Sequence, residues 1–256
     1  MKQTSREDLA EHLRALGLGR GDNVWVQSRL LAFGLIEGGV ETVYAAIRDV
    51  IGDEGTIVVP TYRLQAPPDE PYDPATSPSL NVGPFSEYLR QRPGAVRSLC
   101  PMHSHAAEGP LAAMLREPSG HVSLGPGSDF EQLHRHDFIN VYLGIARQFH
   151  DAATYPVHVQ AMLGNIPYRQ WLELKRFIVR DGSVQPFTVR YYGRKKGSRR
   201  ENLALAHELL QRAGRLRSAP CPYGESCAMS LHDYHEVLRQ ALEGNPTLFL
   251  GQPVEK

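Results

Sequence analysis

Two short segments rich in β-branched residues, separated by a helical pattern, most constrain how this chain folds. Residues 23–28 (NVWVQS) and residues 55–62 (GTIVVPTY) have the composition of buried strands. Between them, Gly38 and Gly39 precede apolar residues that recur at helical spacing up to Val50. A strand, a helix and a second strand in this order form a βαβ unit, whose strands are parallel. The sequence therefore predicts an α/β protein.

The remaining segments extend this unit to a predicted three-layer α/β/α fold around a central mixed sheet. Residues 140–145 have the pattern of a third buried strand, and residues 153–163 that of a helix or an irregular turn. Other predicted helices are an N-terminal one capped by Thr4 or Ser5, and residues 85–90, 202–213 and 230–242. Two strand-like runs flank Asp181-Gly182, which predicts a small antiparallel hairpin. Because no linker divides the chain, we expect residues 1–256 to form a single domain of two intertwined lobes.

Charge and cysteine content limit the classes of function. The chain carries 28 basic and 28 acidic residues, so its net charge gives no reason to expect a nucleic-acid or membrane partner. Its three cysteines lack metal-type spacing and are typical of free thiols in a reducing compartment. The start, MKQTSREDLAEHLRALG, lacks the apolar core of a signal peptide, and no run approaches the ~20 apolar residues of a membrane span. We therefore expect a cytoplasmic protein.

The densest group of chemically active side chains lies in residues 97–105 (RSLCPMHSH). The group consists of Arg97, Ser98, Cys100, His103, Ser104 and His105. Guanidinium, hydroxyl, thiol and imidazole groups bind anions and transfer protons. The alternative is a polar loop before the helix-like run of residues 111–116, since short polar clusters also recur by chance. The residue types alone leave both interpretations open.

Three further segments are candidates for ligand binding. Backbone N–H groups at a Gly38-Gly39 helix start can hold a phosphate, although a glycine pair there is more often only a turn. Residues 64–84 contain six of the nineteen prolines and are expected to form a long loop, a type that often lines a site. Residues 194–200 (RKKGSRR) form a basic run, which is usually a solvated face but also suits a phosphorylated ligand.

Six motifs follow one another in a characteristic order. They are Gln27-Ser28-Arg29-Leu30, Gly38-Gly39, residues 55–61 (GTIVVPT), Asp73-Pro74 with Pro78-Ser79, residues 92–104 (RPGAVRSLCPMHS) and residues 125–128 (GPGS). Over roughly residues 23–170 they resemble the aminoglycoside 3-N-acetyltransferase family, coenzyme-A-dependent enzymes that acetylate amines of aminoglycosides and some other natural products. Each motif alone is weak, whereas six in the same order are specific. The C-terminal residues 171–256 lie outside the resemblance.

The resemblance implies a site for coenzyme A (CoA) or acyl-CoA as co-substrate, and no metal. By resemblance, the loops that hold CoA contain Ser28, Gly38, Gly39, Arg97, Ser98 and Ser104. Their chemistry agrees, because N–H groups, hydroxyls and a guanidinium bind phosphates and amides. The family also provides precedent for a homodimer, although no segment of this sequence indicates an interface.

The catalytic part of the family pattern is altered in this chain. The family has Thr-x-x-His-x-x-Glu after the third strand, where the His is a general base and the Glu orients it. Counted from Thr154 without a gap, the His position is Val157 and the Glu position is Gln160. A shift by one residue selects His158 but places Ala161 at the carboxylate position. Either way, the carboxylate is missing.

Two more titratable positions differ, since Gln27 and Cys100 each replace a family His.

The leading hypothesis is an N-acyltransferase of antibiotic resistance or natural-product biosynthesis. It moves an acyl group from CoA, or from the thioester of an acyl carrier protein, to an amine of an aminoglycoside-like or other natural product. His158 or His103 is then the base, and Gln27 or backbone N–H groups stabilise the oxyanion.

Two alternatives remain open at this point. Cys100 is a candidate nucleophile that accepts the acyl group first, because His103 and Arg97 stand close to it in sequence and stabilise a thiolate. The other alternative is a non-catalytic ligand-binding relative that has lost the His/Glu pair.

His232 and His235 have a spacing that allows contact with one metal, but no further ligand is apparent, and exposed helix histidines are more common.

The sequence does not identify the acceptor. Three acidic residues of the proline-rich segment, Asp69, Glu70 and Asp73, would favour a polycation such as an aminoglycoside. Arg29, which replaces a family Ser, would favour an anionic substrate instead.

Overall fold

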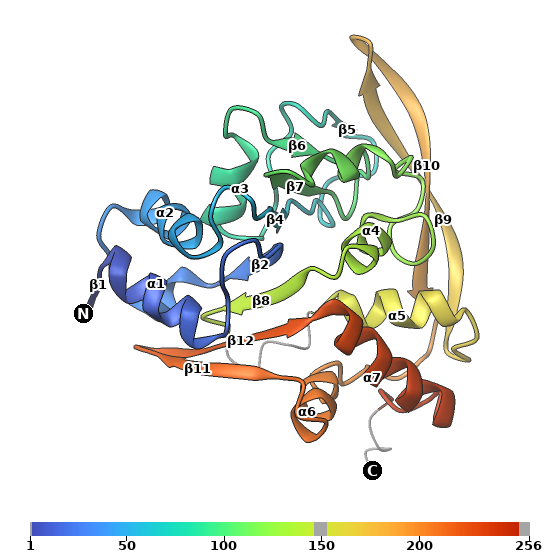
Figure 1. Ribbon diagram of the computed structural model, residues 1–256. Helices are drawn as coiled ribbons and strands as arrows, with labels where there is room; N and C mark the ends of the chain where they lie inside the picture. The colour runs from blue at the N-terminus through green and yellow to red at the C-terminus, as the bar shows by residue number, and fades with distance from the viewer. Residues whose placement is uncertain (1, 146–152, 251–256) are drawn as a thin grey trace.

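A seven-stranded mixed sheet forms the centre of the molecule, seen in a computed structural model that describes residues 2–145 and 153–250 (Figure 1). Its strands lie in the order β11 (Arg217–Cys221), β12 (Gly224–Ser230), β8 (Ile139–Leu143), β2 (Val24–Ser28), β4 (Ile57–Pro60), β7 (His105–Glu108) and β6 (Val96–Arg97). Strand β2 is parallel to both β4 and β8, and the other pairs are antiparallel. The predicted mixed sheet is thus confirmed.

Alternating side chains of the strands enter two separate hydrophobic cores, one on each face of the sheet. Val24 and Val26 pack into one core, whereas Trp25 packs into the other, as the period of a strand requires. The first core is covered by α1 (Arg6–Ala15), α2 (Gly39–Ile51) and α3 (Pro84–Arg90). The second core is covered by α4 (Asp129–Arg135), α5 (Tyr155–Leu163), α6 (Leu205–Arg212) and α7 (Leu231–Gly244). The fold is therefore the predicted three-layer α/β/α arrangement.

The predicted antiparallel hairpin is longer than the sequence suggested. Strands β9 (Arg169–Arg180) and β10 (Ser183–Arg194) pair along their full length, and β5 (Pro71–Tyr72) adds a short third strand. The turn uses Asp181 and Gly182, both with positive φ (50° and 72°), as a two-residue hairpin loop requires. Figure 1 shows this hairpin running alongside α5 and projecting beyond the sheet.

The helix predictions are mostly confirmed, and their details explain the boundaries. Ser5, rather than Thr4, caps α1, and it forms a reciprocal capping box with Asp8. The short segments that complete the fold are β1 (Gln3–Thr4), β3 (Leu35–Ile36) and the 3-10 helices η1 (Leu30–Phe33) and η2 (Ala112–Arg116). Among the described residues, no helix is long and apolar enough to cross a membrane.

The polar segment of residues 97–105 is only partly a loop. Its last residue, His105, begins strand β7, which lies between β4 and β6. The sequence HAAE contains no β-branched residue, so its composition gave no strand signal. Burial between two neighbouring strands determines its structure instead.

Candidate active site

Three adjacent hollows form a trough at the carboxyl ends of β2 and β4. The helix-end hollow, about 370 Å³, lies beside the start of α2 and is lined by Ser28, Arg29, Leu30, Leu31, Gly34, Ile36, Gly39, Val40, Gly83 and Pro84. The central hollow, about 360 Å³, is lined by Gln27, Ser28, Pro60, Tyr62, Leu64, Gln65, Leu80, Asn81, Val82, Gly83, Tyr142, Ile145, Ala153 and Thr154. The hairpin hollow, about 230 Å³, is lined by Leu64, His103, Leu124, Ala153, Thr154, Val157, Arg169, Tyr191, Arg194, Arg200, Glu201 and Leu203. Each neighbouring pair shares lining residues, so the three hollows are continuous.

The helix-end and central hollows meet at Ser28, the last residue of β2. Its hydroxyl oxygen is buried and has no hydrogen-bond partner among the described residues. A buried hydroxyl without a partner costs free energy, which a polar ligand group in the trough would recover. Gly38 and Gly39, both with positive φ (72° and 63°), begin α2 here, and Gly39 lines the helix-end hollow. Two of the residues that the sequence selected for CoA, Ser28 and Gly39, therefore line the trough, and Gly38 lies next to Gly39.

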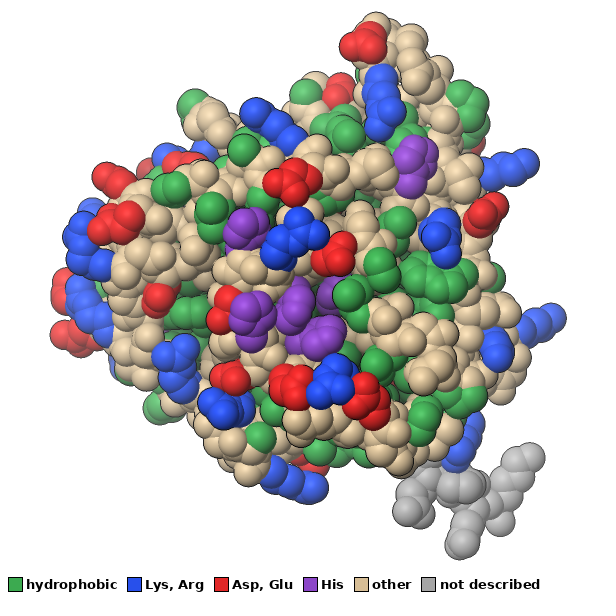
Figure 2. Space-filling model, turned by 45° about the vertical axis from the view of Figure 1, so that its right-hand side comes forward, with side chains coloured by type: hydrophobic (Ala, Val, Ile, Leu, Met, Phe, Trp, Pro, Cys, Tyr) green, Lys and Arg blue, Asp and Glu red, His purple; other side chains and the backbone are tan. Residues whose placement is uncertain are grey.

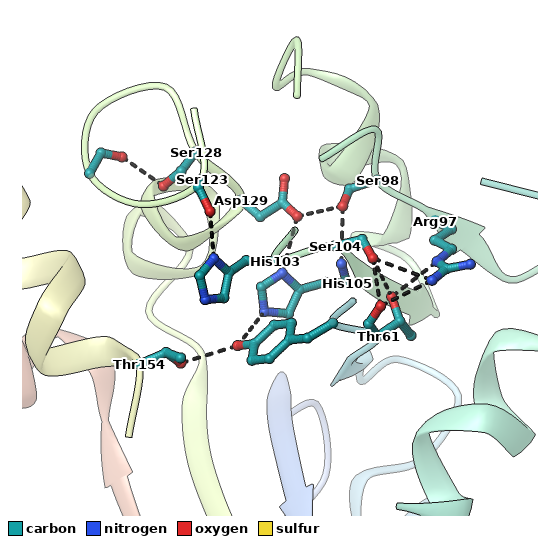
Figure 3. Close-up of polar contacts among 12 residues, drawn as sticks. Thr61, Arg97, Ser98, His103, Ser104, His105, Ser123, Ser128, Asp129 and Thr154 are labelled. Atoms are coloured by element: carbon teal, nitrogen blue, oxygen red, sulfur yellow. Dashed lines mark hydrogen bonds and ion pairs between the residues drawn. The ribbon is translucent and has the colours of Figure 1, made fainter. Parts of the chain in front are cut away.

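Arg97 lies behind the wall of the trough, and its guanidinium is hydrogen-bonded to other groups of the protein. Its guanidinium donates to the carbonyl of Thr61 (3.0 Å) and to the Thr61 hydroxyl (3.1 Å) (Figure 3). It also donates to the carbonyl of Ser77. Burial lowers the pKa of Arg97. Ser104 donates to the same Thr61 carbonyl at 2.7 Å. Neither residue lines a hollow, so they fix the end of β4 and the proline-rich loop, and the geometry gives them no direct contact with a ligand in the trough.

A chain of hydrogen bonds runs from a buried carboxylate to the trough. Asp129, at the start of α4, accepts from the Ser98 hydroxyl and lies 3.1 Å from Nδ1 of His105. On the other side of the imidazole, Nε2 lies 3.3 Å from the Tyr62 hydroxyl, and this hydroxyl lies 3.1 Å from Oγ1 of Thr154 (Figure 3). His105 is fully buried and Asp129 is 2% exposed, whereas Tyr62 and Thr154 line the central hollow. Because Ser98 belongs to this chain of contacts, its hydroxyl is not available to CoA.

The direction of each hydrogen bond in this chain follows from Asp129. A carboxylate only accepts, so Nδ1 of His105 carries the proton and Nε2 is the acceptor. Tyr62 therefore donates to His105, and Thr154 donates to Tyr62. Burial raises the pKa of Tyr62 well above its ordinary value, which keeps this hydroxyl protonated. The chain of contacts is thus aligned to pass a proton from the trough toward His105.

His103 is the one imidazole that lines the trough within the described residues. Nδ1 lies 2.5 Å from the Ser123 hydroxyl, and the ring belongs to the wall of the hairpin hollow. Burial and the neighbouring His105 lower the pKa of His103 to about 3, so the ring is neutral at pH 7. A ring with so low a pKa is a weak general base, but it can accept a hydrogen bond.

Cys100 is placed for packing rather than nucleophilic attack. The thiol is 1% exposed in a small core with Tyr72 and Met102, and it lines none of the three hollows. Burial and the nearby Asp129 raise its pKa to about 12, so the reactive thiolate is absent at pH 7. The predicted Cys100 nucleophile is therefore not supported by the geometry, because its environment is apolar and closed.

His158 points away from the trough, into the core beside α4. Its Nδ1 accepts from the backbone N–H of Gly125 (3.1 Å), and its ring stacks on Phe130. Burial lowers its pKa well below the ordinary value. The residue that lines the hairpin hollow from this helix is Val157, the position that the ungapped count gave to the family His. The hypothesis that His158 is the base is therefore unsupported by its position.

A carboxylate does reach the position beside Gln160, but from another segment. Glu201 accepts from Gln160 Nε2 at 2.9 Å and forms a buried ion pair with Arg169. Arg169 also donates to the carbonyl of Tyr192 at 2.7 Å. Glu201 and Arg169 both line the hairpin hollow. The sequence analysis missed Glu201 because it directly follows the basic run of residues 194–200, far from Gln160 along the chain.

Three other histidines lie close together outside the trough. His134 contacts both His232 (4.9 Å between ring centroids) and His235 (4.4 Å). Figure 2 shows a group of histidine side chains on one face of the molecule. Within the described ranges, no three His, Cys, Asp or Glu side chains are arranged to hold a metal ion. Asp69, Glu70 and Asp73 line none of the three hollows, whereas Arg29 lines the helix-end hollow.

Tyr62, Thr154 and Asp129, like Glu201, are residues of this site that the sequence analysis did not select for a role. A usable signal existed for Tyr62, since it follows the carboxyl end of β4, and ligands of α/β proteins bind at the carboxyl ends of the strands. No such signal existed for Asp129, which the sequence presents as an ordinary residue of a helix start.

Comparison with known proteins identifies the family of this chain. A family model described as aminoglycoside 3-N-acetyltransferase matches residues 25–243. The chain belongs to this family. Among curated relatives, aminoglycoside N(3)-acetyltransferase III of Salmonella sp is 33% identical over 208 residues, which are 73% of this chain and 71% of the relative. Aminoglycoside N(3)-acetyltransferase VII of Streptomyces paromomycinus is 36% identical over 197 residues, 70% of this chain and 67% of the relative.

Solved structures of aminoglycoside acetyltransferases superimpose on nearly the whole chain. AAC-IIIb in a binary complex with CoASH has a TM-score of 0.84 at 22% identity and covers 99% of this chain and 100% of its own. A variant of aminoglycoside acetyltransferase AAC(3)-IVa, in complex with gentamicin, has a TM-score of 0.81 at 26% identity and covers 99% and 93%. As a member of this family, the protein is an enzyme of the N-acyltransferase type.

Proposed function

We propose that this protein transfers an acetyl group from acetyl-CoA to an amine of a small molecule. The observation that carries the proposal is the continuous trough, in which the Ser28 end and the Thr154 end are joined by the central hollow. At the Ser28 end, backbone N–H groups at the start of α2 and an unpartnered buried hydroxyl suit the phosphates of CoA. The related AAC-IIIb structure with CoASH supports CoA as the donor, and the AAC(3)-IVa structure with gentamicin supports an amine acceptor.

The two substrates meet where the central and hairpin hollows join. Both hollows are lined by Leu64, Ala153 and Thr154, so a group at this junction can touch the Thr154 hydroxyl. When the amine nitrogen bonds to the acetyl carbon, the carbon–sulfur bond breaks and the nitrogen must lose a proton. We assign the transfer of this proton to the contacts between Thr154, Tyr62 and His105.

The proton balance follows the directions of these hydrogen bonds. The amine proton passes to the Thr154 oxygen, the Thr154 proton to Tyr62, and the Tyr62 proton to Nε2 of His105. Asp129 stabilises the imidazolium that results, as a carboxylate does in other His–carboxylate pairs. Return of this proton along the same path to the thiolate of CoA restores the resting state.

Two residues beside the junction have supporting roles in this proposal. His103, neutral because its pKa is lowered to about 3, orients the amine by accepting a hydrogen bond from it. Gln27 lines the central hollow and donates one amide hydrogen to Asn140 (3.1 Å), which leaves a second hydrogen for the oxyanion of the transition state.

The first experiment measures CoA binding and the role of Tyr62 together. Titration calorimetry with CoA and acetyl-CoA is expected to show micromolar binding to the wild type. Tyr62→Phe removes only the hydroxyl that joins His105 to Thr154, so we expect kcat to fall about 100-fold, the usual lower range of proton-transfer catalysis. The Kd for acetyl-CoA is expected to stay within about twofold, because the phenyl ring keeps the wall of the trough.

Tyr223→Phe is the matched control, because Tyr223 is exposed and lines none of the three hollows. Absence of CoA binding to the wild type would overturn the proposed function. Full activity of Tyr62→Phe together with normal CoA binding would retain acetyl transfer and refute only the proton path.

A further inference from the structure

A carboxylate on α3 holds a short loop that forms one wall of the trough. Glu87 accepts hydrogen bonds from the backbone N–H (3.0 Å) and the hydroxyl (2.7 Å) of Ser79. The residues after Ser79, residues 80–83, all line the central hollow, and Pro84, the first residue of α3, lines the helix-end hollow. Glu87 therefore fastens the start of this loop to the helix that follows it.

The loop has little burial to stabilise it. None of residues 80–83 is buried, and two of them are exposed. A segment with few buried apolar contacts opens locally at low cost in free energy unless hydrogen bonds hold it. The backbone N–H of Leu80 donates to the carbonyl of Tyr62 (2.8 Å), and the two hydrogen bonds between Ser79 and Glu87 hold the residue just before it. The position of this wall therefore depends on contacts at its start.

The neighbours of Glu87 on α3 direct its carboxylate toward Ser79. Nε of Arg90 donates to Glu87 at 3.0 Å, and Gln91 donates at 2.8 Å. Arg90 also donates to the carbonyl of Ala75 (3.3 Å), which belongs to the same proline-rich segment as Ser79. Burial opposes ionisation of Glu87, but the hydrogen bonds from Arg90 and Ser79 outweigh it and lower the pKa to about 2. The carboxylate is therefore charged at pH 7.

The central hollow suits the arm of acetyl-CoA that connects the phosphates to the thioester. Among the described residues that line this hollow, none carries a charge, and Gln27, Gln65 and Asn81 provide amide groups. The pantetheine arm is itself an uncharged chain with amide groups. In the proposed function, the phosphates lie at the start of α2 and the thioester lies at Thr154. The arm then crosses the central hollow along residues 80–83.

We propose that Glu87 is a positioning residue for the donor: by holding Ser79, it fixes residues 80–83 as the wall against which the arm of acetyl-CoA binds. The inference rests on the proposed acetyl transfer. Glu87 lines none of the three hollows, so its effect on the donor passes through this wall. Without the contacts to Ser79, the loop samples other conformations, and binding of acetyl-CoA must restore the ordered one. The affinity for the donor then falls, whereas the rate at saturating acetyl-CoA is retained.

The test measures acetyl-CoA binding by titration calorimetry, which needs no acceptor. We expect the Kd of Glu87→Ala to be about tenfold higher than that of the wild type, because both hydrogen bonds to Ser79 are lost. Glu87→Gln retains an oxygen that can accept both, so its Kd is expected to stay within about twofold. Ser79→Ala removes only the hydroxyl donor and is expected to raise the Kd about threefold, so the test does not depend on one variant. In kinetic assays, the KM for acetyl-CoA should follow the Kd, with kcat within about threefold of the wild type.

Glu236→Ala is the matched control. Glu236 accepts from an Arg three residues and a Gln four residues further along α7, as Glu87 does on α3, but it has no partner outside its own helix in the part of the chain that the structure describes. We expect its Kd for acetyl-CoA to stay within about twofold of the wild type.

Hydrogen exchange separates this role from a general loss of stability. The amides of residues 79–83 are expected to exchange about tenfold faster in Glu87→Ala, and saturating acetyl-CoA is expected to restore their protection. An unchanged Kd in both Glu87→Ala and Ser79→Ala would overturn the inference, as would unchanged exchange of these amides or an equal loss of affinity in Glu236→Ala. Absence of acetyl-CoA binding to the wild type would instead refute the proposed function.

Discussion

Replacement of Asp129 by Asn provides a sharp test of the proton path. The side chain is 2% exposed, and one carboxylate oxygen faces both the Ser98 hydroxyl and Nδ1 of His105 (3.1 Å). Asn has nearly the same shape but no charge. If its NH2 group faces His105, the imidazole must present Nδ1 as acceptor and Nε2 as donor. Tyr62 then has no acceptor at Nε2 for the proton that the reaction delivers.

The expected loss follows from the distance between Asp129 and His105. Charge centres of an imidazolium and a carboxylate in this contact are about 4 Å apart, which at an effective dielectric constant of 20 corresponds to about 4 kcal/mol. Part of this energy is retained by the hydrogen bond that the Asn NH2 group donates to the neutral imidazole, so about 3–4 kcal/mol is lost from the transition state. At about 1.4 kcal/mol for each tenfold change in rate, kcat is expected to fall by roughly 10²–10³-fold.

The assay follows release of the CoA thiol with a saturating amine, together with calorimetric binding of acetyl-CoA and the thermal midpoint. We expect unchanged acetyl-CoA binding and a Tm within about 3 °C of the wild type, because the shape of the buried side chain is retained. Asp53→Asn is the control, since Asp53 is an exposed turn residue far from His105 in the fold. A kcat within threefold of the wild type would refute the role of the Asp129–His105 pair.

Two further predictions concern groups outside this pair. Cys100→Ala is expected to keep kcat within twofold and to lower the free energy of unfolding by about 1 kcal/mol. The reason is that the buried thiol, whose pKa is raised to about 12, only packs against its neighbours. An acetylated Cys100 in mass spectra after acetyl-CoA treatment would contradict this prediction. Burial and mutual repulsion lower the pKa values of His134, His158 and His235, the last to about 4. The unfolded chain therefore binds more protons between about pH 6.5 and 4, and the free energy of unfolding is expected to fall as the pH decreases through this range. Urea denaturation at several pH values measures this fall, and His235→Gln should make it shallower; identical slopes would count against the histidine cluster.

The sheet was predictable because its central strands carry their own signal. The three parallel strands carry mostly Val and Ile on one face and Trp25, Val58 and Tyr142 on the other, and each face lies under a layer of helices. Strand β7 carries no such signal, because its sequence HAAE acquires strand structure only from pairing with β4 and β6. Local composition therefore predicts the centre of this sheet better than its edge.

The candidate site was predictable at the points where it is formed by local backbone geometry. Positive φ values at Gly38 and Gly39 and the end of β2 at Ser28 follow from local sequence. The roles of Arg97 and Ser98 did not follow, because residue type does not reveal whether a polar group faces the ligand or the protein. The guanidinium of Arg97 donates to the carbonyls of Thr61 and Ser77, and only the folded structure brings these groups together.

The departures from the family pattern and the Asp129–His105 contacts have a common explanation in the geometry of the trough. The α5 wall presents Val157 to the hairpin hollow, so no imidazole from that helix reaches the junction at Thr154. The opposite wall provides an imidazole with a carboxylate behind it and two hydroxyls in front. An acetyl transfer needs one proton acceptor within reach of the amine, and the wall that supplies it is not fixed by the fold. In the proposed mechanism, His105 and Asp129 therefore take the part that the family pattern gives to the His and Glu of the segment after the third strand.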